Sequence, residues 1–214
     1  ITQPSDGDII AVSTTSAATA GSFEVEVQQL AQGSRAVHDD ANSYTATTDV
    51  VTASGGTLTF TAGAKTFDVT LAAGATLADL RQAINDATDN FGLSANIINT
   101  GGASPLSKLV MSSDETGAGN DLTITSNTAE LDKVSTTANG GGAGGMVIAP
   151  ADQARDAIMI IDGISTSSSS NTFTDVIQDT TITALKVDTN KGTLNIETDK
   201  ESVRETIEKF VESF

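Results

Sequence analysis

The chain has 214 residues, with 28 acidic and 11 basic side chains, one histidine and no cysteine, and its formal charge is −17 at pH 7. This charge repels phosphate backbones and anionic lipid, so we expect no nucleic-acid or membrane partner. No apolar run reaches the roughly 18 residues of a membrane helix, and the missing cysteines exclude disulfide scaffolds. The sequence opens on Ile1 without an initiator methionine, so we expect a piece of a longer protein.

The N-terminal region predicts two strands, at residues 8–18 and 21–30. The second alternates clearly, with Phe23, Val25 and Val27 on one face and polar residues on the other. This period of two is typical of a half-buried strand. Residues 32–48 have no such periodicity, and we expect a loop there.

A hairpin and a helix are predicted next. Residues 55–71 alternate on both sides of a turn at residues 62–64. Thr76 is a suitable N-cap with Asp79 at the third helical position, where a carboxylate favours the helix start. The stripe that follows has helical spacing and ends before the stop signal at residues 90–92; its members are Leu77, Leu80, Ile84 and Ala87.

Further strands are expected along the rest of the chain, at residues 94–99, 106–112, 121–125, 156–161, 171–177, 181–187 and 193–198. The polar segment 127–145 ends in a glycine-rich run and is predicted to be a flexible connector or long loop. The serine tract 165–170 is predicted to be a polar connector or turn. The fold class is therefore mainly β with minor α (α+β), with two small β-rich domains.

The last segment predicts an amphipathic helix that starts after Asp199. Its apolar face follows the spacing i, i+4, i+7, i+8 and i+11, and consists of Val203, Ile207, Phe210, Val211 and Phe214. We expect this helix to continue into a helical bundle or coiled coil, with the apolar face as an interaction surface. The alternative is a C-terminal helix that docks on the β-rich domain.

One short motif suggests a metal. Residues 117–122 match the core of a calcium-binding β-roll repeat, which makes Asn120 and Asp121 candidate calcium ligands. Such sites need stacked repeats, and the sequence contains one copy. A glycine-rich turn that leads into a strand is the favoured interpretation, so we expect no metal and no cofactor.

Catalytic motifs are weak. His38 has no nucleophile motif beside it and is predicted to be a surface residue in a loop. Neighbouring acids such as Asp39 and Asp40 would have to face each other across a cleft for glycosidase chemistry, and adjacent acids usually mark a solvated surface. The residues therefore indicate a structural or binding module and not an enzyme.

Several segments together resemble a known family. Residues 23–32, 56–99, 109–117, 151–157 and 169–177 are similar, in the same order, to segments of the bacterial flagellar hook-associated protein 2 family, the flagellar filament cap. Residues 56–99 are similar to the flagellin hook IN motif found in that family. The resemblance covers most of the chain and identifies it as a head-domain fragment.

The resemblance implies a structural role without covalent chemistry. It implies a ring-shaped homo-oligomer at the filament tip, whose head domains form a plate beneath which exported flagellin folds and inserts. Other implied partners are the hook–filament junction proteins and an export chaperone. The implied location is extracellular, at the flagellum tip, after export by the flagellar type III pathway.

The resemblance also suggests a division into domains. Residues 8–45 and 150–198 are expected to form a leg-proximal head domain, residues 46–149 an inserted distal domain, and residues 199–214 the start of a leg helix. A sequential split near residue 120 is the alternative. The competing function is a β-rich surface adhesin that binds host mucin or glycans.

Overall fold

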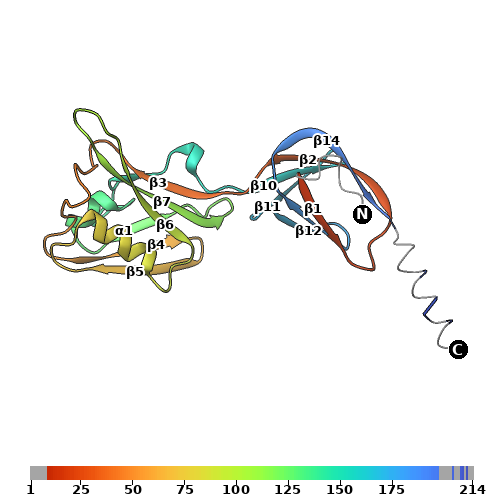
Figure 1. Ribbon diagram of the computed structural model, residues 1–214, viewed down its shortest axis with the longest axis horizontal. Helices are drawn as coiled ribbons and strands as arrows, with labels where there is room; N and C mark the ends of the chain where they lie inside the picture. The colour runs from red at the N-terminus through yellow and green to blue at the C-terminus, as the bar shows by residue number, and fades with distance from the viewer. Residues whose placement is uncertain (1–8, 198–203, 205–207, 210, 212–214) are drawn as a thin grey trace. The chain divides into compact units, whose positions relative to one another are not determined.

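The computed structural model describes residues 9–197 together with residues 204, 208, 209 and 211 (Figure 1). The chain divides into two compact units. The terminal unit comprises Ile1–Leu30 and Ala157–Phe214, and the inserted unit comprises Ala31–Asp156. Among the described residues, strands account for 49% and helices for 12%, which confirms the mainly β class with minor α.

The terminal unit contains two antiparallel sheets. One has the order β1-β13-β12 and the other the order β11-β10-β2-β14. Their strands are β1 (Ile10–Thr14), β2 (Gly21–Gln29), β10 (Ala157–Ile161), β11 (Ile164–Ser168), β12 (Thr172–Ile177), β13 (Thr180–Ala184) and β14 (Asp188–Ile196).

Alternating side chains from both sheets form the core of the terminal unit. Val25 and Val27 of β2 are buried, as the period of two predicted, and Met159 of β10 is buried beside them. Ile182 of β13 and Phe173 of β12 are buried from the other sheet. On β2 the positions directly before the buried valines carry the polar Glu24 and Glu26, as expected for a strand with one buried face.

The inserted unit also contains two antiparallel sheets, with the orders β6-β7-β3-β9 and β5-β4-β8. It carries the α-helix and two 3₁₀ turns. Its elements are β3 (Gly33–His38), β4 (Gly56–Ala62), β5 (Lys65–Leu71), α1 (Leu77–Asp86), β6 (Leu93–Asn99), β7 (Ser107–Thr116), β8 (Thr123–Ser126), η1 (Ala129–Val134), β9 (Met146–Val147) and η2 (Pro150–Asp152).

The predicted hairpin is confirmed as β4 and β5. Ala62 pairs with Lys65, which leaves a two-residue turn. Gly63, the first turn residue, has φ +57°, a conformation that glycine adopts without steric cost. Across the hairpin, the rings of Phe60 and Phe67 stack with their centroids 5.0 Å apart and help to fill the core.

The predicted helix start is confirmed as a capping box. The Thr76 hydroxyl accepts a hydrogen bond from the Asp79 amide at 3.2 Å, and the Asp79 carboxylate accepts one from the Thr76 amide at 2.9 Å. Two of the helix's orphan amide donors are thereby satisfied. Leu77, Leu80 and Ile84 are fully buried, so the predicted apolar stripe faces the core.

Three loop predictions were wrong. Residues 33–38 form β3, whose inward positions include the polar Ser34 and His38, and these polar residues hid the period of two. In the predicted connector 127–145, η1 buries Leu131 and Val134. The serine tract begins within β11, which pairs with β10 through its backbone and needs no apolar pattern.

The domain boundaries lie elsewhere than the sequence placed them. Residues 31–45 and 150–156 belong to the inserted unit, because β3 pairs with β7 and Gln32 pairs with Arg155. The assignment of leg-proximal and distal head domains stays a prediction.

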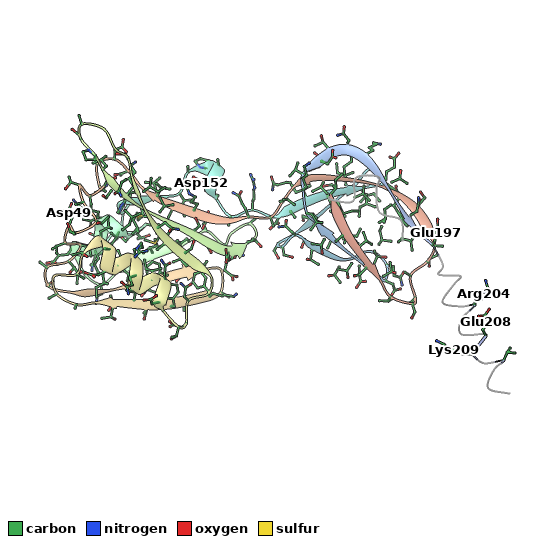
Figure 2. The ribbon with its side chains drawn as sticks, in the orientation of Figure 1. Asp49, Asp152, Glu197, Arg204, Glu208 and Lys209 are labelled. Carbon is green, nitrogen blue, oxygen red and sulfur yellow. The ribbon has the colours of Figure 1, made fainter. Side chains whose placement is uncertain are left out.

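The C-terminal segment is described at four positions, Arg204, Glu208, Lys209 and Val211, which are helical and exposed. Figure 2 labels the first three of them. The Arg204 guanidinium donates to the Glu208 carboxylate at 2.9 Å, one helical turn away. The other members of the predicted apolar face lie outside the described residues: Val203, Ile207, Phe210 and Phe214. Within the described part of the chain, no helix is both long and apolar enough to cross a membrane.

Candidate functional site

The calcium candidate is a loop that connects β7 to β8. The Asp121 carboxylate accepts a hydrogen bond from the Ala154 amide at 2.7 Å, and the Asn120 side-chain amide donates to the Thr116 carbonyl at 2.6 Å. Both side chains are thus engaged with backbone groups. Among the described residues, no cluster of three or more His, Asp or Glu side chains could hold a metal ion. The calcium candidate therefore rests on the motif alone, and the expectation of no metal stays a prediction.

His38 was predicted to be a surface residue in a loop, and that prediction was wrong. It lies at the end of β3 with 1% of its surface exposed. Its Nδ1 accepts a hydrogen bond from the Leu109 amide at 3.0 Å, so Nε2 carries the proton and donates to the Lys133 carbonyl at 2.9 Å. Burial lowers the pKa of His38 to about 4, and the hydrogen bond to the Lys133 carbonyl offsets only part of this shift. The ring therefore joins β3, β7 and η1 as a neutral structural group.

A carboxylate that the sequence analysis did not single out fixes a loop of the inserted unit. Glu130, in η1, accepts hydrogen bonds from the Thr52 hydroxyl at 2.8 Å and from the amides of Ala53 and Ser54 at 2.7 and 3.1 Å. The pKa of Glu130 is lowered, chiefly by the hydrogen bond from the Ser54 backbone. The sequence contains no local signal for this contact, since 76 positions separate Ser54 from Glu130.

The acid pairs of the sequence do not face each other across a cleft. Asp39 accepts hydrogen bonds from the backbone and side chain of Asn42, while Asp40 forms an ion pair with Lys108. Glu115 pairs with Lys65 at 2.5 Å. These carboxylates organise loops and edges, and their geometry is not that of a glycosidase.

The terminal unit carries an apolar cleft of about 290 Å³. It lies between the β10–β11 turn and the end of β12, and its apolar walls are Phe23, Ile161, Ile164, Val176 and Ile177. Ile164 is 67% exposed and adjoins the other apolar residues of the wall, so that together they form an exposed apolar patch. Such a surface can bind another apolar group.

Two family models match the chain. The flagellin hook IN motif matches residues 57–115, which span the hairpin, α1, β6 and nearly all of β7. The model of the flagellar hook-associated protein 2 C-terminus matches residues 154–214.

Individual relatives agree with these models. The flagellar hook-associated protein 2 of Aeromonas caviae is 40% identical over 223 residues, a match that covers 100% of this chain and 45% of the relative. The chain thus spans about half the length of the curated relatives it matches.

Solved structures match in fold as well. The D1-D2-D3 domains of the Escherichia coli flagellar cap protein FliD match with a TM-score of 0.77 and 25% identity, over 95% of this chain and 56% of that one. The D2-D3 domains of the same protein match with a TM-score of 0.75 and 25% identity, over 92% of this chain and 99% of that one. The terminal and inserted units together therefore correspond in extent to a D2-D3 pair.

Proposed function

Because this chain belongs to the flagellar hook-associated protein 2 family, we propose that it forms the head of a cap at the distal end of the bacterial flagellar filament. The observation that carries this proposal is the match of the whole chain to the Aeromonas caviae protein, together with the fold shared with cap D2-D3 domains. The corresponding location is extracellular, at the flagellum tip.

In this role the head domains assemble into a ring-shaped plate, and exported flagellin folds and inserts beneath it. The work is done by binding and steric confinement and needs no covalent step. The relatives are named as cap or hook-associated proteins, so we assign no enzymatic activity. A cap that holds the tip and also advances needs contacts that are individually weak and repeated, which suits small β-rich units that present small contact surfaces.

The proposed partners are other copies of this protein, flagellin, the hook–filament junction proteins and an export chaperone, with export through the flagellar type III pathway. The charge of −17 supports the absence of nucleic acid and membrane from this set.

Deletion of the gene that encodes the parent protein tests the proposal. We expect bald cells that release unpolymerised flagellin into the medium, and recovery of filaments when the wild-type gene is restored. Immunoblots of the medium and electron micrographs of the cells measure both effects. Normal filaments with a loss of attachment to host mucin would contradict the cap and indicate the adhesin.

A further inference from the structure

The terminal unit carries two exposed apolar surfaces that its own core does not use. The first is the cleft described above. The second, which we name the knob, consists of Leu185, Lys186 and Val187, directly after β13. Leu185 is 51% exposed and Val187 is exposed to a similar degree.

The cleft lies at the edges of the two sheets of the terminal unit. It opens between β11 and β12, which are edge strands of different sheets with no hydrogen-bonded register between them among the described residues. The turn beside it is rigid, because Asp162 and Gly163 have positive φ angles of 48° and 81° and the Asp162 carboxylate accepts a hydrogen bond from the Glu24 amide at 2.7 Å. Ile164 is therefore held at the mouth of the cleft.

The charges around the cleft are mainly negative. Asp162 forms part of its wall, and Asp175 directly precedes the lining residue Val176. Neither aspartate forms a salt bridge with a described residue, whereas nearby Glu24 is paired with Lys191 at 2.8 Å. A partner for this cleft would therefore combine apolar side chains with a positive charge.

The knob combines these two features. Lys186 lies between two exposed aliphatic residues and forms no salt bridge with any described residue. The acid that follows the knob, Asp188, accepts hydrogen bonds from the backbone and side chain of Asn190. The segment is also well anchored, because the amides of Leu185 and Lys186 both donate to the Ile9 carbonyl, at 2.8 and 3.3 Å. The knob thus presents its side chains from a fixed backbone.

We infer that the knob of one copy of this chain binds in the cleft of the next copy. The two surfaces match in character, apolar with apolar and basic with acidic. They lie beyond opposite ends of β13, a strand of five residues that spans about 17 Å. The knob of a chain therefore does not reach the cleft of the same chain. The contact is head-to-tail, the type that closes into a ring when the rotation between copies allows it. The inference rests on the proposed ring and names the surfaces that form it.

Disulfide trapping tests the contact on the 214-residue chain, which has no cysteine of its own. The double variant Ile164→Cys, Leu185→Cys is oxidised and separated on a non-reducing gel. A head-to-tail contact extends from copy to copy, so we expect a ladder of covalent trimers and larger species. The matched control is Ile98→Cys, Val147→Cys, whose side chains are 49% and 48% exposed on the inserted unit. We expect it to form at least about tenfold less ladder, the level of random collision.

A charge variant separates a specific contact from collision. Adding Lys186→Glu to the cysteine pair should slow ladder formation several-fold at low salt, and raised salt should slow the parent pair in the same way. Equal ladders from the test and control pairs would overturn the inference. Dimers from Ile164→Cys alone, formed as fast as the ladder, would also overturn it, because they indicate a two-fold contact.

The result can be read separately from the gene deletion. Bald cells combined with no specific ladder would leave the cap role intact and remove only these two surfaces. Normal filaments combined with a specific ladder would establish the contact and remove the cap role.

Discussion

The inserted unit and the terminal unit are both built from two small sheets, but they are fixed in different ways. In the described residues, every aromatic ring pair lies in the inserted unit, as does every carboxylate whose pKa is lowered: Asp39, Asp49, Asp79 and Glu130. The terminal unit relies mainly on strand pairing and an aliphatic core. In the inserted unit, carboxylates accept the hydrogen bonds of loop amides. Acid protonates these carboxylates and should therefore weaken the inserted unit first.

The largest expected effect comes from removing a core ring in each unit. Phe60→Ala leaves a cavity beside Phe67 and should destabilise the inserted unit by about 3–5 kcal/mol. Phe173→Ala, equally buried in the terminal unit, is the matched variant. Limited proteolysis with mass mapping should place the new cleavage sites of Phe60→Ala within residues 31–156 and those of Phe173→Ala outside them. Identical cleavage patterns would show that the units unfold together.

The next largest effect is acid sensitivity that arises from His38. The folded pKa is about 4 and the ordinary value is 6.5, so between these two values the unfolded chain binds a proton that the folded chain does not. Stability is therefore complete above pH 6.5 and falls as the pH is lowered to 4, by about 3 kcal/mol.

Urea denaturation at a series of pH values measures this loss. The chain has one histidine, so the terminal unit is the internal control and should change little over the same range. Amide hydrogen exchange, read on peptic fragments of each unit after quenching, distinguishes the two during the titration. Equal loss in both units between pH 6.5 and 4 would contradict the assignment to His38.

A smaller effect is expected at the helix start. Thr76→Ala removes the hydroxyl that caps the Asp79 amide and should cost about 1 kcal/mol of inserted-unit stability. Thr189→Ala, at an exposed position on β14, should change stability by less than about 0.5 kcal/mol. The urea midpoints of the two variants provide the comparison, and equal midpoints would show that the capping box contributes nothing measurable.

The smallest effect should occur at the mouth of the cleft. Ile164→Ser replaces a side chain that is already mostly in water, so terminal-unit stability should stay within about 0.5 kcal/mol of the wild type. Thermal melting followed by circular dichroism measures it. A loss of several kcal/mol would show that Ile164 supports the core and is not available to a partner.

Features that depend on neighbouring residues could be predicted from the sequence, whereas features that depend on contacts between distant residues could not. The hairpin around Gly63 and the cap formed by Thr76 and Asp79 depend on neighbours within a few positions, so they could be predicted. β3 could not, because its pairing with β7 is more than 70 positions away and its inward face carries Ser34 and His38.

The candidate surfaces show the same limit. The family followed from ordered sequence segments, but the cleft is built from Phe23, Ile161 and Val176, which lie in three separate parts of the chain. The Glu130 contacts likewise join segments that only the folded chain brings together. The members of the C-terminal apolar face outside the described residues stay predictions.

The way the chain passes through the inserted unit has a consequence for how such proteins diversify. Gln29 and Ile158 are paired in the terminal unit, and Gln32 and Arg155 are hydrogen-bonded to each other at 3.1 and 3.0 Å in the inserted unit. The outgoing and returning segments are therefore neighbours at the point of insertion. A cut at this point needs only a short turn between β2 and β10 to restore a continuous hairpin. The inserted unit is thus an exchangeable cassette, which evolution or an engineer can replace without altering the strand order of its host.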